Sequence, residues 1–150
     1  MSSILNLVRN HPQREFSAGE IVIEQTEHSG LLYILIEGEV EVLRDDVRVA
    51  KASEPGAVFG EMAALLGSQH TATVRALRSS TFALVENPRG FLQSSPEASL
   101  HVAELLARRL DALNRYLIDV KRQYEGHDHL GMVDEVLEAL MNRHPRPAVS

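Results

Sequence analysis

The 150-residue chain contains no cysteine. It can therefore form no disulfide framework, offer no thiolate nucleophile and bind no zinc ion or iron–sulfur cluster through cysteine. It also lacks any apolar run close to the roughly 20 residues that a membrane-spanning helix needs. Its first residues show no charged segment followed by an apolar one, as a signal peptide would. We therefore expect a soluble, cytoplasmic protein with no membrane partner.

Excess positive charge is missing as well. The formal net charge is −6, which argues against non-specific binding to nucleic acid or to an anionic membrane. Hydrophobic residues make up 44% of the chain, enough for a packed core. The length fits one domain with an appended element, and we predict a domain over residues 1–125 and an appended helix and tail over 126–150.

Short strand patterns separated by turns occupy the first half of the chain. They lie at residues 21–23, 31–36, 39–43, 47–52, 71–76 and 81–86. The run at 31–36 is almost continuously apolar, as expected for a strand that is buried on both faces. Gly38 and the pair Asp45-Asp46 mark tight turns. This succession predicts an all-β barrel or sandwich.

Helical patterns flank the strands. A short amphipathic helix is predicted over residues 3–11. Asn87 is a suitable N-cap with Pro88 at the first helical position, so a helix is predicted from there to residue 93. Ser95-Pro96 begins a long helix that Gly126 should stop, and a last amphipathic helix is predicted over residues 129–144, with Asp128 as its cap.

The long helix carries a heptad pattern. Apolar residues alternate at spacings of three and four, at Ala103, Leu106, Leu110, Leu113, Leu117, Val120 and Tyr124. Such a stripe can pack onto the helix's own barrel, and apolar residues off the stripe indicate that part of the helix does so. Sustained over three heptads, the spacing favours a parallel homodimer, with an interface at Leu106, Leu110, Leu113, Leu117 and Val120.

Residues 59–76 contain most of the candidate ligand-binding residues. They read Phe-Gly-Glu-Met-Ala-Ala-Leu-Leu-Gly-Ser-Gln-His-Thr-Ala-Thr-Val-Arg-Ala, a small-residue turn, one acidic residue, a short apolar helix turn and an alternating strand. Glycine lets a ligand approach the backbone closely, and N–H groups at a helix start attract an anion. The Glu61 carboxylate can accept hydrogen bonds from a sugar hydroxyl. The layout suits capture of a phosphate and a ribose.

This stretch closely resembles the phosphate-binding cassette of the cyclic nucleotide-binding domain family, whose usual form is F-G-E-(L/M)-A-L-(I/L), a gap, and P-R-(A/S/T)-A-T-V. Residues 59–66 and 71–74 match, and the run 30–38 and the order of elements over residues 13 to about 120 agree as well. The resemblance implies a mainly β fold with helices, an eight-stranded jelly-roll barrel followed by a long dimerisation helix and a C-terminal helix.

The resemblance also implies a site for cAMP or cGMP. Glu61 would accept from the ribose 2′-hydroxyl, and the backbone N–H groups of Met62 and Ala63 would face the cyclic phosphate. Base-contacting residues would lie on the long helix, although Asn114 reads equally well as an exposed residue. The implied ligand-binding set is Phe59, Gly60, Glu61, Met62, Ala63, His70, Thr71, Ala72, Leu113 and Asn114.

The chain departs from the family pattern at Gln69 and His70, which replace the proline and the phosphate-binding arginine. Histidine is shorter and about neutral at pH 7, so the lost charged contact predicts roughly tenfold to a few hundredfold weaker phosphate binding. His70 is either a weaker phosphate contact or a drifted residue in a pocket that no longer binds the nucleotide tightly. Arg75 could supply a charge instead, but its odd spacing from His70 points it to the opposite face.

Three functions remain in competition. The first is a stand-alone regulatory module that senses cAMP or cGMP, without an enzymatic step, and signals through helix movement to an unknown effector protein. Only a short helix follows residue 126, too little for a DNA-binding winged helix, so no direct DNA binding is expected. The second is a dimeric interaction module with a vestigial or altered pocket. The third, remote, is a cupin-type metalloenzyme, although His70 is the strands' one histidine and His127-Asp128-His129 is better explained as a solvated helix start.

Overall fold

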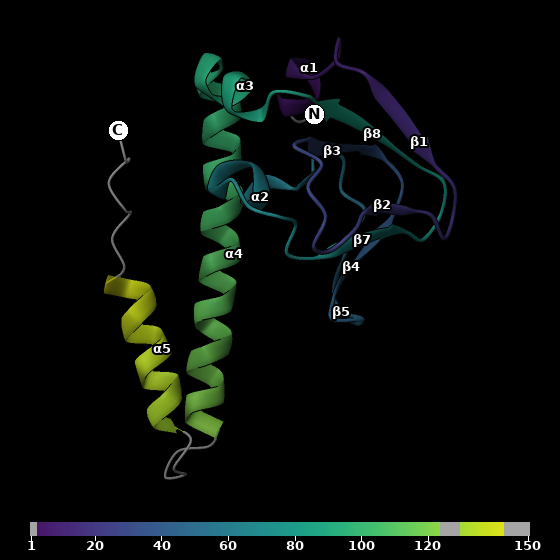
Figure 1. The fold of residues 1–150 in the computed structure, drawn as a ribbon. Coiled ribbons are helices and arrows are strands. Elements are labelled where there is room, and N and C mark those ends of the chain that lie inside the picture. The colour runs from purple at the N-terminus through teal and green to yellow at the C-terminus, as the bar shows by residue number, and fades with distance from the viewer. Residues whose placement is uncertain (1–2, 124–129, 143–150) are drawn as a thin grey trace. The chain divides into compact units, whose positions relative to one another are not determined.

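The computed structural model describes residues 3–123 and 130–142. Eight strands and five helices follow one another along this part of the chain (Figure 1). Their bounds are α1 Ser3–Leu7, β1 Gln13–Phe16, β2 Ile21–Ile23, β3 Leu32–Glu37, β4 Val40–Arg44, β5 Val47–Ala52, β6 Val58–Phe59, α2 Glu61–Leu66, β7 Thr73–Ala76, β8 Ser80–Val85, α3 Pro88–Ser94, α4 Pro96–Gln123 and α5 Leu130–Asn142.

The strands form two four-stranded antiparallel sheets, in the orders β1-β8-β3-β6 and β2-β7-β4-β5. The predicted fold class, a mainly β roll with eight strands followed by a long helix and a C-terminal helix, is confirmed. The predicted closure into a barrel is wrong, because no ladder joins the two sheets among the described residues. The strand at one edge, β6, has two residues, too few to bridge the sheets.

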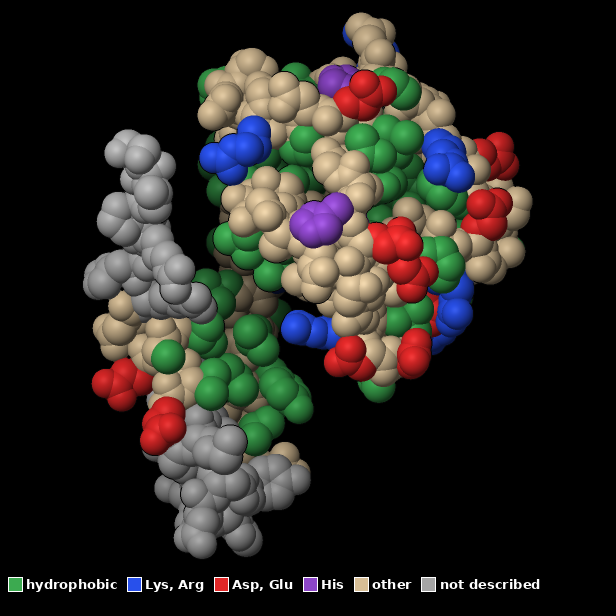
Figure 2. Space-filling model, in the orientation of Figure 1, with side chains coloured by type: hydrophobic (Ala, Val, Ile, Leu, Met, Phe, Trp, Pro, Cys, Tyr) green, Lys and Arg blue, Asp and Glu red, His purple; other side chains and the backbone are tan. Residues whose placement is uncertain are grey.

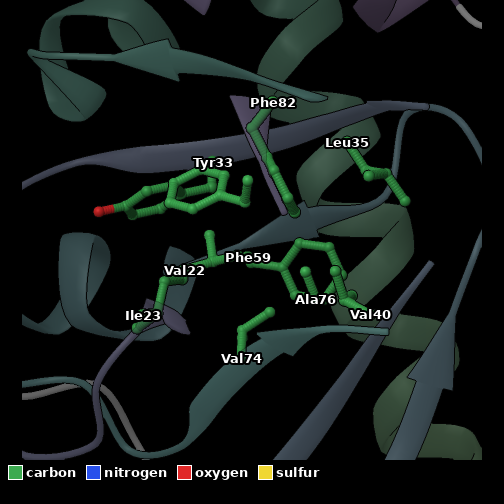
Figure 3. Close-up of a cluster of buried hydrophobic side chains, with 10 residues drawn as sticks. Val22, Ile23, Tyr33, Leu35, Val40, Phe59, Val74, Ala76 and Phe82 are labelled. Atoms are coloured by element: carbon green, nitrogen blue, oxygen red, sulfur yellow. The ribbon is translucent and has the colours of Figure 1, made fainter. Parts of the chain in front are cut away.

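The core lies between the two sheets. Phe82 of β8 stands at its centre, and its ring makes edge-to-face contacts with Phe16, Tyr33 and Phe59 at centroid distances of 5.8, 6.3 and 6.0 Å. Figure 3 shows this cluster with the aliphatic side chains around it. The predicted double burial of β3 is confirmed, because Leu32, Tyr33, Ile34 and Leu35 are all buried.

The predicted turns are also confirmed. Gly38 has φ 132°, and a Cβ there would overlap Ser80 of β8, so the β3–β4 turn requires glycine. Asp45 and Asp46 have φ 51° and 65°, the positive values that a two-residue hairpin turn of type I′ requires. The side chain of Gln25 holds this turn, donating to Asp45 Oδ1 and accepting from Asp45 N, both at 3.0 Å.

The helices begin much as predicted. Asn87 caps α3 by accepting from Gly90 N at 3.2 Å, with Pro88 at the first position. The chain divides into two compact units, residues 1–103 and 104–150, and α4 begins in the first. There Ala98 and Val102 are buried. The predicted boundary after residue 125, the stop at Gly126, the cap at Asp128 and the tail lie outside the described residues.

Candidate functional site

Gly60 determines how the cassette begins. It caps α2 in the left-handed conformation, with φ 84° and ψ 5°. A Cβ at this position would lie 3.0 Å from the carbonyl oxygen of Leu31 and 3.4 Å from His70 Cε1. The strained φ and the tight space both favour glycine. Because no side chain stands here, the imidazole of His70 can lie close to the backbone just before α2.

Glu61 is the first residue of α2, and its side chain is buried, with 5% of the residue exposed. Long charged side chains are seldom buried to this extent unless they have partners. Glu61, the residue predicted to bind the ribose, is thus buried, and it does not line the pocket beside His70. Met62, next along, is 45% exposed, so only its backbone can play the predicted part.

His70 is fastened to the loop between β2 and β3. Its backbone N–H donates to Glu27 O and its carbonyl accepts from Thr26 N, both at 2.9 Å. The imidazole Nε2 lies 2.7 Å from Ser29 Oγ, and the ring packs edge-on to Tyr33 at 6.5 Å. With 5% of the residue exposed, His70 is not a drifted surface residue.

Burial sets the charge of this imidazole. Removal from water is the largest influence and lowers the pKa of His70 below its ordinary 6.5, the neighbouring His28 lowers it further, and Glu27 opposes both. The ring is therefore neutral at pH 7 in the absence of a ligand. It offers one N–H donor in place of the permanent charge of an arginine.

A pocket of about 360 Å³ opens beside His70. It lies between the β2–β3 loop, α2 and the β8–α3 connection. Its basic members are His28, His70 and Arg89, its acidic member is Glu86, and the rest of its wall is formed by Gly30, Leu31, Ala63, Ala64, Gly67, Ser68, Asn87 and Pro88. Arg89 also donates to the carbonyl of Leu65 at 3.2 Å, near the end of α2.

The predicted site residues are therefore divided. Ala63 and His70 share the pocket wall, while Thr71 and Ala72 follow His70 and are half-buried. The ring of Phe59 packs against Phe82 in the hydrophobic core, so it supports the cassette from the core. Leu113 and Asn114 are on α4 in the second unit, and their base-contacting role stays a prediction.

Arg75 is engaged elsewhere, in agreement with its predicted orientation. Its Nε and Nη2 lie 3.1 and 3.0 Å from Oε2 of Glu41, whose Oε1 accepts from Arg48 Nε at 3.1 Å. The hydrogen bond from Arg75 is the largest influence on Glu41 and lowers the pKa of that carboxyl below its ordinary 4.5. This cluster ties β5, β4 and β7 together.

Sequence reasoning missed Ser29, His28 and Arg89 as members of the site. The register of the first sheet explains how they meet, because Leu32 of β3 pairs with Val85 of β8. The residues just before β3 and just after β8 therefore end up side by side. Without that register, the separate signals at residues 28–31 and 86–89 could not be joined.

The described residues contain neither a metal-binding cluster nor a helix suited to a membrane. No group of three or more histidine, aspartate or glutamate side chains could hold a metal ion there. None of the described helices combines the length and the apolar character that crossing a bilayer requires. The motif His127-Asp128-His129 lies outside the residues that the structure describes.

Comparison with curated proteins finds short matches. Residues of this chain are 37% identical over 68 positions to an uncharacterised ABC transporter ATP-binding protein of Mycobacterium bovis, covering 43% of this chain and 21% of that protein. They are 32% identical over 69 positions to a cAMP-dependent protein kinase regulatory subunit of Yarrowia lipolytica, covering 46% and 18%. The chain spans about a fifth of the length of these relatives.

Solved structures share the fold over longer stretches. The catabolite activator protein of Thermus thermophilus superposes with a TM-score of 0.62 at 23% identity, over 92% of this chain and 82% of that one. A cyclic nucleotide-binding domain from Methylobacillus flagellatus gives 0.64 at 18% identity, over 77% and 81%. The sequence model described as "Cyclic nucleotide-binding domain" matches residues 13–92, more than half of the chain. The family match, the cassette motif and the fold of the two sheets agree, and the chain belongs to the cyclic nucleotide-binding domain family.

Proposed function

We propose that this domain is a regulatory module that binds a cyclic mononucleotide, cAMP or cGMP, at the cassette. The observation that carries the proposal is the cassette geometry, in which left-handed Gly60 precedes α2 and leaves room beside its backbone for the buried imidazole of His70, whose Cε1 would lie 3.4 Å from a Cβ at Gly60. That arrangement offers N–H donors to a cyclic phosphate. The relative from Yarrowia lipolytica, which is named for cAMP dependence, supports this ligand class.

Within this proposal, Glu61 accepts a hydrogen bond from the ribose 2′-hydroxyl. It lies one residue after the close-approach glycine, and it is buried. A charge-assisted bond in such a position contributes about 1–3 kcal/mol to binding. The role in the cell is binding and regulation, with no chemical step on the ligand.

The experiment is a calorimetric double-mutant cycle. Wild type and Glu61→Ala are each titrated with cAMP, cGMP and the 2′-deoxy forms of both. If Glu61 holds the 2′-hydroxyl, wild type binds the 2′-deoxy ligands about tenfold more weakly, and Glu61→Ala binds both forms with equal affinity. Equal discrimination in wild type and mutant would remove Glu61 from the ribose. Circular dichroism confirms that the variant is folded.

The output of the module is proposed to pass through α4. Ligand binding would shift a two-state equilibrium in which this helix takes different positions, and two copies would pair in parallel along its stripe. Of the stripe, Leu110 and Leu113 are 47% and 46% exposed, while Leu106, Leu117 and Val120 are half-buried, and hydrophobic side chains are visible along α4 (Figure 2). The apolar residues Val136, Leu140 and Met141 of α5 are also exposed, which suits contact with an effector protein.

A second candidate function is favoured by one observation. His70 is neutral and already hydrogen-bonded to Ser29, so the pocket lacks the fixed charge of the usual cassette. The domain would then act as a dimeric interaction module whose pocket is vestigial or takes another ligand. The same titration separates the two, because this candidate predicts no heat with cAMP or cGMP at millimolar concentration.

A further inference from the structure

The ring of His70 is held through one nitrogen. Nε2 lies 2.7 Å from Ser29 Oγ, on a loop that two backbone hydrogen bonds fasten to His70 itself. In a neutral imidazole one nitrogen carries the proton and the other accepts. The partner of Nε2 therefore decides whether the ring can still donate to an anionic ligand.

The surroundings of the Ser29 hydroxyl show which way this bond runs. Leu31 N donates to Ser29 Oγ at 3.2 Å, so one lone pair of the oxygen is occupied while its proton stays available. A hydroxyl that donates to oxygen makes a bond of about 2.7–2.8 Å, shorter than the 2.9–3.0 Å usual when a nitrogen donates to oxygen. Ser29 Oγ keeps a second lone pair, so the 2.7 Å separation from Nε2 is the observation that favours donation by the serine.

We propose that Ser29 is a positioning residue that holds His70 as its Nδ1–H tautomer, so that a neutral imidazole donates to the ligand's phosphate. With Nε2 as acceptor, Nδ1 must carry the proton. The reverse tautomer would leave a bare Nδ1 lone pair, which repels a phosphate oxygen. The ligand half of this inference rests on the proposed function, and the tautomer half does not.

Other ionisable groups stand near the ring. They come from the β2–β3 loop, from β3, from the β8–α3 connection and from the start of α3, and are Glu27, His28, Tyr33, Glu86 and Arg89. The burial that lowers the pKa of His70 outweighs the opposing Glu27. A neutral donor is consequently the form that meets a ligand at pH 7.

Nuclear magnetic resonance of ¹⁵N-labelled protein tests the tautomer directly at pH 7.5. Long-range correlations from the ring protons separate a protonated from a bare imidazole nitrogen. We expect wild-type His70 to show a protonated Nδ1 and a bare Nε2. Ser29→Ala should move the ring toward the Nε2–H form, and Ser29→Thr, which keeps the hydroxyl, should restore Nδ1–H.

Titration with cAMP and cGMP provides the second readout. Loss of one neutral hydrogen bond predicts roughly two- to tenfold weaker binding by Ser29→Ala and near wild-type binding by Ser29→Thr. Ser68→Ala is the matched control, because its hydroxyl lines the same pocket but donates to Gln69 O, and it should change neither readout.

The outcomes are distinguishable. An Nε2–H ring in wild type, or an unchanged ring in Ser29→Ala, overturns the inference whatever the ligand does. If neither nucleotide binds wild type, the proposed function fails, and the ring spectra alone then decide whether Ser29 sets the tautomer. If the tautomer changes in Ser29→Ala while affinity does not, the ligand half is overturned.

Discussion

A single residue, His70, limits the charge of the cassette. His70→Arg should tighten cAMP or cGMP binding about tenfold or more, because a guanidinium stays charged and can bond a phosphate through two N–H groups. The adjoining 360 Å³ pocket gives the longer side chain room. His28→Arg is the matched control, since it adds the same charge to the same pocket. Equal tightening by both variants, measured calorimetrically, would mean that general charge and not the cassette position matters.

The same residue predicts a pH dependence. In the free protein burial holds the pKa of His70 below 6.5, and a bound phosphate anion raises it by favouring the protonated ring. At pH 7.5 and above the ligand meets the neutral ring, but as pH falls through the bound-state pKa binding takes up protons, so affinity rises and then levels off below the free-state pKa. Calorimetry from about pH 8 to 5.5 should show this rise and its absence in His70→Arg. A wild-type affinity that falls over this range contradicts the assignment.

Glu41 predicts a different pH effect, on stability. Its pKa is lowered in the folded state by Arg75 and Arg48, so its ion pairs stabilise the fold above the unfolded pKa near 4.5, and this contribution is lost as pH falls through the folded-state value. Glu41→Gln should therefore lower the unfolding temperature at pH 7 and make less difference near pH 3. Glu37→Gln, on an exposed residue of β3, is the control and should have little effect at either pH.

At the scale of single residues, the sequence predicted the residues of the cassette but not the pocket residues that come from other segments of the chain. Gly60, Glu61 and His70 stand out because their order along the chain is itself the signal. Ser29 and Arg89 do not, since a lone serine or arginine in a loop carries no pattern until the β3–β8 register places it. The burial of His70 was also hidden, because Ser29, the hydrogen-bond partner of its ring, lies 41 positions away in the sequence.

At the scale of elements, α3 depends on its cap. Asn87→Ala removes the acceptor of the Gly90 N–H and should lower the free energy of unfolding by about 1 kcal/mol. Asn87→Asp keeps the acceptor and should be close to wild type. Urea denaturation of both variants measures the difference. A loss of the same size in Asn87→Asp would show that the amide, and not the cap, is responsible.

Sequence periodicity predicted the strong elements within a residue or two. The strands β2 and β5 have the predicted bounds, and β3, β4 and β8 are shifted by one residue. Two strands were missed for physical reasons. In β1 the first three residues are exposed, so no alternation marks it, and β6 is only two residues long. The predicted strand at 71–76 begins at Thr73, because the bonds of His70 to the β2–β3 loop hold the residues before it.

For the whole molecule, the stripe on α4 leads to a prediction about assembly. Leu110→Asp would bury an unpaired charge in a helix–helix seam and should convert a dimer to a monomer in sedimentation velocity at tens of micromolar. Ala112→Asp, which places the same charge on an exposed residue of α4 at an outward heptad position, is the control and should leave the dimer intact. Wild-type protein that sediments as a monomer at this concentration would contradict the assembly. The sequence shows the stripe, but a stripe alone does not identify what covers it.

The pairing of the outermost strands has a consequence for the order in which the polypeptide folds during its synthesis. Gln13 of β1 pairs with Ala83 of β8, and Ile21 of β2 pairs with Arg75 of β7, whereas β4 and β5 close across a two-residue turn. During synthesis the hairpin can form early, but β2 must wait until the chain has grown past residue 76 and β1 until it has grown past residue 85. Ribosome-bound chains that stop short of β7 should therefore leave both amino-terminal strands open to chaperones, and the roll closes only when its last strands emerge.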